Sequence, residues 1–149
     1  MNDKQQNTPL TVLLADDDID DCLFFSKALK ELPITTHLKI VSDGEQLMAY
    51  LSKNSEHLPD VLFLDLSMPR KTGFECLQEI YENEKLKSIH IVVFTISYPH
   101  NPDFEKEIIN TLSGMGARNY IRKSSDFTKL KQDIYDALIL LTANEIPIE

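Results

Sequence analysis

The sequence predicts an α/β fold, namely a doubly wound sheet of five parallel strands with helices on both faces. Five short apolar runs alternate with five longer amphipathic segments, as expected for repeated strand–helix units. The run at residues 61–66 is almost entirely apolar, which is typical of a strand covered on both faces. The 149 residues form one domain of ordinary size, and no repeat or low-complexity stretch divides them.

The first half of the chain shows two strand–helix pairs and a third strand. Its first amphipathic segment has apolar residues at helical spacing, and Pro33 ends it. The expected elements are a strand at 10–15, a helix at 19–32, a strand at 37–41, a helix at 43–51 and a strand at 61–66.

The second half continues the alternation. Leu77 and Ile80 belong to the apolar stripe of its first helix, and Ser125 stands where the N-cap of the last helix is expected. The expected elements are a helix at 73–86, a strand at 89–94, a helix at 104–112, a strand at 117–122 and a helix at 125–141.

Composition excludes several classes of protein. The formal net charge of −9 argues against a nucleic-acid-binding surface, which needs a basic footprint. No apolar run reaches the roughly 18 residues that a membrane helix needs, and the polar N-terminus lacks a signal core. Cys22 and Cys76 show no metal-ligand or redox spacing. We therefore expect a cytoplasmic protein with reduced cysteines and neither a nucleic-acid nor a membrane partner.

Polar residues follow the predicted strands where ligands bind in such sheets. Asp16 and Asp17 follow the first strand, Asp65 lies at the end of the third, Thr95 ends the fourth and Lys123 ends the fifth. In the flavodoxin-like strand order 2-1-3-4-5, the first and third strands are neighbours at the switch point. The three carboxylates are therefore expected to meet at one edge of the sheet.

Three converging carboxylates repel one another, and a hard divalent cation is the usual remedy. Mg²⁺ prefers oxygen ligands and takes one or two carboxylates directly. Lys123 would add a positive charge and Thr95 a hydroxyl donor, which together form a receptor for a phosphoryl group on a carboxylate. Each residue alone also has an ordinary explanation, because Asp17 or Asp18 could cap a helix, Thr95 could be structural and Lys123 could be solvated.

Four segments of this chain resemble the response-regulator receiver domains of two-component signalling. They are VLLADDD at 12–18, VLFLDLSMPRKTGF at 61–74, VVFT at 92–95 and YIRK at 120–123. The resemblance extends over residues 9–141, and the combination of segments is specific, whereas the acidic run alone is weak. It implies a polar extension at 1–8, a receiver domain at 9–143 and a tail at 144–149.

The resemblance implies a metal site and a phosphoacceptor. Asp65 would accept a phosphoryl group from a histidine kinase. Asp17 would bind Mg²⁺ directly, Asp16 largely through water, and the carbonyl of Ser67 would be the third protein ligand. The protein would thus be a switch with self-phosphorylation chemistry and slow self-dephosphorylation, and not an enzyme acting on a separate substrate.

The resemblance also implies a conformational relay. Thr95 and Lys123 would hold phosphoryl oxygens, and Tyr120 would be the aromatic switch that turns inward when Thr95 moves toward the phosphate. Another protein, unknown from the sequence, would recognise the altered surface.

Three features depart from the usual receiver pattern. Ser124 replaces the proline that commonly follows the lysine, which puts the usual cis peptide bond in doubt. Ile96 is bulky where a small residue is common, and the stretch from Thr95 to Lys123 is longer, with the extra length expected at 97–104. The Lys-Ser pair and the lack of room for an output domain resemble the regulators paired with bacterial phytochrome kinases.

Two other functions remain open. Phosphatases with an aspartyl nucleophile use a similar sheet, but they usually carry a second Asp two residues after the nucleophile, where this chain has Ser67. A degenerate receiver would bind partners without being phosphorylated.

The last helix carries more apolar residues than one stripe needs. Phe127, Tyr135, Ile139 and Leu140 lie beside the stripe, and Ile146 and Ile148 follow in the tail. Either Phe127 caps the core and the others are scattered exposed residues, or the set forms a patch for a partner. We expect the patch, and with it a homodimer through the region of the last helix.

Overall fold

The computed structural model describes residues 8–96 and 102–145 and confirms the doubly wound α/β fold. The strands form one sheet in the order β2-β1-β3-β4-β5, and every neighbouring pair is parallel. Their bounds are β1 Leu10–Ala15, β2 Thr36–Val41, β3 Val61–Leu64, β4 His90–Thr95 and β5 Asn119–Arg122.

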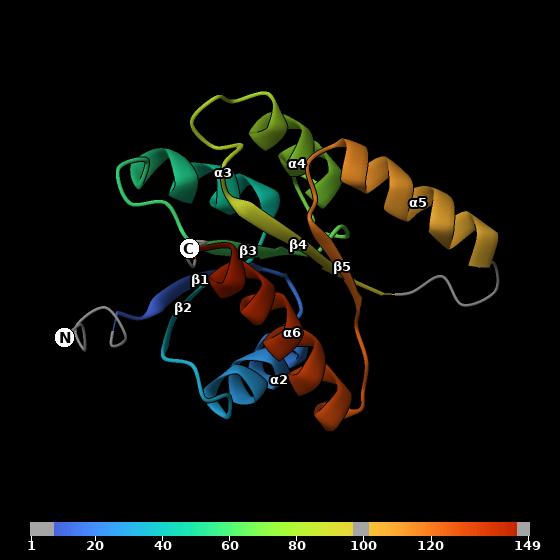
Figure 1. Ribbon diagram of the computed structural model, residues 1–149. Helices are drawn as coiled ribbons and strands as arrows, with labels where there is room; N and C mark the ends of the chain where they lie inside the picture. The colour runs from blue at the N-terminus through green and yellow to red at the C-terminus, as the bar shows by residue number, and fades with distance from the viewer. Residues whose placement is uncertain (1–7, 97–101, 146–149) are drawn as a thin grey trace.

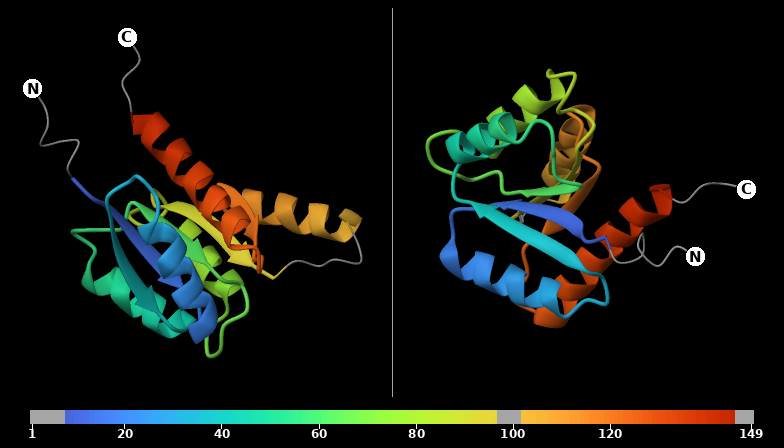
Figure 2. Two further views of the ribbon diagram at one scale, coloured as in Figure 1. Left: turned by 90° about the horizontal axis from the view of Figure 1, so that it is seen from below. Right: turned by 90° about the vertical axis from the view of Figure 1, so that its left-hand side faces the viewer.

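The helices divide between the two faces of the sheet (Figures 1 and 2). α2 (Ile19–Lys30) and α6 (Phe127–Glu145) cover one face. α3 (Gly44–Lys53), α4 (Gly73–Tyr81) and α5 (Pro102–Gly114) lie over the other. None of the described helices is long and apolar enough to cross a membrane.

Each face of the sheet has its own apolar core, because successive strand side chains point to opposite faces. On the side of α2 and α6, the Phe25 ring packs against Phe63 and Phe94, with centroids 4.9 and 5.6 Å apart. On the side of α3 and α4, Leu13 and Leu64 pack with Leu47 and Leu77. These two cores hold the strand ends in register.

Several element boundaries differ from the sequence-based expectation, and two of these differences have a clear local cause. α4 ends at Tyr81 and not near residue 86, because Asn83 Oδ1 accepts hydrogen bonds from the backbone N–H groups of Lys85 and Leu86 in a turn. Leu86 still reaches the core, so its apolar character is satisfied without a helix. α6 begins at Phe127, and the Asp126 carboxylate accepts the backbone N–H of Lys129, so the prediction of Ser125 as the N-cap was wrong.

The loop between β3 and α4 packs tightly on neighbouring backbone. A Cβ on Gly73, where this loop enters α4, would lie 2.2 Å from the carbonyl oxygen of Asp65, so only glycine fits there. Arg70 adopts a φ of 68°, the left-handed region that side chains other than glycine rarely enter. Within the described residues no peptide bond is cis, so the Lys123–Ser124 bond is trans.

Candidate functional site

The register of the sheet brings the predicted residues to one edge. Ala15 on β1 pairs with Leu64 on β3, and the N–H of Asp65 donates to the carbonyl of Ala15 at 3.0 Å. Asp16 and Asp65, the residues that follow each strand, therefore lie side by side. Thr95 ends β4, the next strand across the sheet.

Asp16, Asp17 and Asp65 form a carboxylate cluster, in which one oxygen of each lies within 4.8 Å of the others. Asp16 and Asp65 are 1% and 3% exposed, whereas Asp17 is exposed. Asp65 Oδ1 accepts hydrogen bonds from the N–H of Ser67 at 3.1 Å and from Thr95 Oγ1 at 3.3 Å. The expected meeting of the three carboxylates is thus what the fold produces.

Lys123, just beyond β5, reaches into this cluster. Its Nζ donates to Asp65 Oδ2 at 3.2 Å and lies 2.9 Å from Asp16 Oδ2. It also donates to Asp21 Oδ2 at 2.8 Å. Burial alone would lower the pKa of Lys123, but the surrounding carboxylates outweigh burial and raise it, so the ammonium group is charged at neutral pH.

The pKa of Asp16 reflects its burial within this cluster. Burial raises its pKa to about 6, although a hydrogen bond from the N–H of Asp18 and the contact with Lys123 both favour the charged form. The buried Asp16 Oδ2 accepts no hydrogen bond from the described residues, because Lys123 approaches it closely but outside hydrogen-bond geometry. Asp16 Oδ2 therefore forms an ion pair with Lys123 and can still accept a further ligand.

The donor set fits a hard cation such as Mg²⁺. The cluster offers only carboxylate oxygens, two of them on buried side chains, and one buried oxygen lacks a hydrogen-bond donor. The cluster carries three negative charges when ionised, against the one positive charge of Lys123 that touches it. A divalent cation would remove most of the remaining repulsion.

Asp18 and Asp21 have separate positions at the start of α2. Of the two caps that the sequence left open, Asp18 is the N-cap, and its carboxylate accepts the backbone N–H of Asp21 at 3.0 Å. Sequence reasoning missed Asp21, because an acidic residue in the first helical turn usually needs no further explanation. Asp17 lies before the N-cap of α2, so no helical spacing links the two acids, and no local pattern in the sequence marks Asp21 as part of the site.

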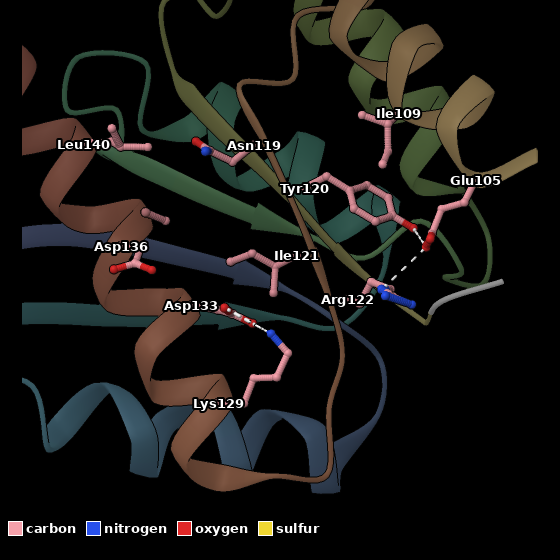
Figure 3. Close-up of a pocket in the computed structure, with 11 residues that line it drawn as sticks. Glu105, Ile109, Asn119, Tyr120, Ile121, Arg122, Lys129, Asp133, Asp136 and Leu140 are labelled. Carbon is pink, nitrogen blue, oxygen red and sulfur yellow. Dashed lines mark hydrogen bonds and ion pairs between the residues drawn. The ribbon is translucent and has the colours of Figure 1, made fainter. Parts of the chain in front are cut away.

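Tyr120 lies outside the carboxylate cluster. Its side chain is half-buried, and its hydroxyl donates to Glu105 Oε2 on α5 at 3.1 Å (Figure 3). The same carboxylate lies 3.8 Å from Arg122 Nε. Ile96, immediately after Thr95, is 66% exposed. Of the extra stretch expected at 97–104, residues 97–101 lie outside the described residues and residues 102–104 begin α5.

Comparisons with known proteins agree on one family. A sequence model of the response regulator receiver domain matches residues 12–135. The response regulator Rcp1 of Synechocystis sp. is 38% identical over 103 residues, which are 66% of this chain and 69% of that protein.

Solved structures agree with this match. The Mn²⁺-bound form of Rcp1 superposes with a TM-score of 0.71 at 32% identity, covering 86% of this chain and 91% of that one. The phosphorylated cyanobacterial phytochrome response regulator RcpA has a TM-score of 0.78 at 26% identity, covering 92% and 96%. The bacteriophytochrome response regulator RtBRR has a TM-score of 0.73 at 27% identity, covering 87% and 78%.

Proposed function

Because the chain belongs to the response regulator receiver family, we propose that Asp65 accepts a phosphoryl group from a phosphohistidine of a histidine kinase. The observation that carries this assignment is the surroundings of the Asp65 carboxylate. One of its oxygens faces the hydroxyl of Thr95 and the other faces the ammonium group of Lys123, inside a cluster suited to a divalent cation. A carboxylate so placed is a nucleophile with donors already around it.

Mg²⁺ would bind beside Asp65. Asp17 and Asp65 would be direct ligands, the Ser67 carbonyl a third, and Asp16 would act largely through water. When bound, the ion neutralises charge on the phosphoryl group being transferred. The donor set of the carboxylate cluster supports this choice, and the relative Rcp1 has been solved with Mn²⁺.

The chain's own residues would perform the transfer as follows. An oxygen of Asp65 forms a bond to phosphorus while the bond from phosphorus to the donor imidazole breaks. Lys123 then binds one phosphoryl oxygen. The hydroxyl of Thr95 turns away from Asp65 and donates to a second phosphoryl oxygen. Positioning and charge neutralisation suffice, because phosphoryl transfer needs little covalent help from the protein.

A protein donor explains the exposed apolar side chains around the site. Ile19, Leu23 and Ile96, which we call the apolar rim, are 76%, 64% and 66% exposed. They line hollows shared with Asp17 on one side and Lys123 on the other. Apolar residues gathered around a charged pocket are typical of a surface that a partner covers.

The similarity to RcpA and RtBRR makes a phytochrome-type histidine kinase our candidate for this partner. We infer a cytoplasmic location from a donor of this kind. Cys22 and Cys76 are both free and buried, which is compatible with that reducing compartment.

The output surface in this proposal is the groove between α5, β5 and α6, about 430 Å³ in volume (Figure 3). Tyr120 and Leu140 line it. Movement of Thr95 toward the phosphoryl group would let Tyr120 turn inward and leave Glu105, which changes the groove.

A homodimer through this side is part of the proposal, because Ile139 and Leu140 on α6 are 39% and 49% exposed. Phe127 does not belong to the patch, since it packs against Phe24 with ring centroids 5.3 Å apart and caps the core. Ile146 and Ile148 lie outside the described residues. Sedimentation of the wild type and of an Ile139→Asp, Leu140→Asp variant tests the dimer; equal monomer masses with and without a phosphate mimic would refute it.

Incubation with acetyl phosphate and Mg²⁺ tests the whole assignment. Stable incorporation of one phosphoryl group per chain, absent from Asp65→Asn, supports a receiver. Rapid release of phosphate in many turnovers would instead favour the aspartyl phosphatase. No incorporation at all would favour a degenerate receiver that binds partners without modification.

A further inference from the structure

Lys123 makes its shortest carboxylate contact outside the carboxylate cluster. The distance from its Nζ is 2.8 Å to Asp21 Oδ2, compared with 2.9 Å to Asp16 Oδ2 and 3.2 Å to Asp65 Oδ2. Asp21 is not among the three residues whose carboxylates gather within 4.8 Å in the described chain. The ammonium group therefore stands between two buried acids of the cluster and one acid at its edge.

A bound cation affects these contacts unequally. Asp16 and Asp65 belong to the donor set, so a divalent ion bound there weakens the attraction of these two carboxylates for Lys123. The ion also repels the nearby ammonium group. Asp21 is 37% exposed on its side chain and approaches Lys123 from the first turn of α2. Its attraction for Lys123 is the one that metal binding leaves largely intact.

We propose that Asp21 is a positioning residue that keeps the Lys123 ammonium group beside Asp65 while the divalent cation is bound. This inference rests on the proposed function, since it concerns the state that awaits the phosphoryl group. Without Asp21, the ammonium group of the metal-loaded protein would leave for solvent through the hollow lined by Lys123, Ser124 and Ile96. Lys123 is only 12% exposed, so such a release is measurable.

A general role for Asp21 at the helix N-terminus would have different consequences. Asp20 and Asp21 are both acids of the first turn and both favour the helix dipole. Asp20→Asn therefore removes the same charge from the same turn, and Asp20 has no contact with Lys123 among those found in the described chain. It is the matched control for Asp21→Asn.

The first experiment measures acetylation of lysines by acetic anhydride, read by mass spectrometry, with exposed Lys106 as the internal reference. With saturating Mg²⁺ we expect Lys123 to be acetylated about five-fold faster in Asp21→Asn than in the wild type, because a charge-assisted hydrogen bond is lost. Without Mg²⁺, Asp16 and Asp65 still hold Lys123, and the two rates should agree within about two-fold. Equal rates with Mg²⁺ would overturn the proposal.

The second experiment measures the rate of phosphorylation by acetyl phosphate at saturating Mg²⁺. Removing a negative charge near the site should help an anionic donor to approach, so Asp20→Asn should be unchanged or faster. Asp21→Asn should instead be about five-fold slower, because Lys123 is no longer in place. In a Lys123→Met background, Asp21→Asn should cause no further slowing.

The outcomes separate this inference from the proposed function. A wild type that binds Mg²⁺ but is never phosphorylated would overturn the function, whereas the acetylation rates would still decide the role of Asp21. A phosphorylated wild type in which Asp21→Asn behaves like Asp20→Asn in both experiments would overturn the inference alone.

Discussion

The carboxylate cluster follows β1 and β3, whereas the groove beside Tyr120 lies along the edge strand β5, and the two regions are built differently. The cluster is held by backbone, because Asp16 and Asp65 directly follow strands that are paired residue by residue. The groove is held by side chains of α5 and α6, such as Glu105 and Leu140. The first region is fixed wherever the sheet forms, whereas the second can change without disturbing the sheet.

Burial and charge differ in the same way. Asp65 and Lys123 form their contact with 4% and 12% of their side chains exposed, so water screens it little. Lys129 and Asp133, which line the groove, form an i,i+4 pair that is 59% and 24% exposed. Such surface pairs contribute about 0.5 kcal/mol or less. We conclude that the carboxylate cluster suits phosphoryl transfer and that the groove suits a change of binding partner.

The largest expected effect is on phosphorylation, and it comes from a substitution in the carboxylate cluster. Asp65→Asn should abolish phosphorylation, because an amide of the same shape is not a nucleophile. The free energy of unfolding should stay within about 1 kcal/mol of the wild type, since a charge leaves a repelling cluster. Phosphate incorporation and urea unfolding measure the two effects. Normal incorporation in this variant would mean that the chemistry lies elsewhere.

The second prediction distinguishes two adjacent acids at the pocket. Asp17→Ala should remove most Mg²⁺ binding in a calorimetric titration, together with the rise in unfolding temperature that Mg²⁺ gives the wild type. The reason is that Asp17 belongs to the carboxylate cluster.

Asp18→Ala is the control, because the Asp18 carboxylate caps α2. It should bind Mg²⁺ normally and lose about 1 kcal/mol of stability through the missing cap. Greater damage to Mg²⁺ binding from Asp18→Ala than from Asp17→Ala would contradict the geometry at the end of β1.

The sequence predicts the backbone-built region well. Apolar periodicity locates all ten elements, and the topology rule for parallel sheets brings together the acids after β1 and β3. The reason is that a strand end fixes the position of the next residue in space. Helix ends are less certain, as at Tyr81 and Phe127, because side chains such as Asn83 and Asp126 decide them locally.

Contacts that depend on side-chain placement escape such reasoning. The pairing of Asp21 with Lys123 joins residues 102 positions apart, and nothing in the local sequence of either indicates the other. The contact between Tyr120 and Glu105 depends likewise on where α5 lies over the sheet. These are the contacts on which the proposed positioning and switching depend.

A smaller effect is expected at the apolar rim. Hydrolysis of a phospho-aspartate needs a water molecule in line with phosphorus, and Ile96 lines the hollow beside Lys123. Ile96→Ala should shorten the phosphorylated half-life by about three-fold, since it opens that path to water. Leu23→Ala, on the rim beside Asp17, is the control and should leave the half-life unchanged. An unchanged or longer half-life in Ile96→Ala would remove Ile96 from any gating role.

The smallest effect concerns Tyr120. Tyr120→Phe removes the hydrogen bond to Glu105 and should lower the free energy of unfolding by about 1 kcal/mol, as measured by urea unfolding. Phosphorylation by acetyl phosphate should stay within about two-fold of the wild type, because the hydroxyl donates to Glu105 on α5 (Figure 3).

Glu105→Gln is the matched variant, since the amide oxygen can still accept from Tyr120 while the charge that faces Arg122 is lost. A double-mutant cycle between Tyr120→Phe and Glu105→Gln measures the coupling of the two side chains. If Tyr120→Phe slowed phosphorylation ten-fold or more, the hydroxyl would act in the chemistry itself. The groove and the carboxylate cluster would then be one region, and the contrast between a fixed pocket and an adaptable surface would fail.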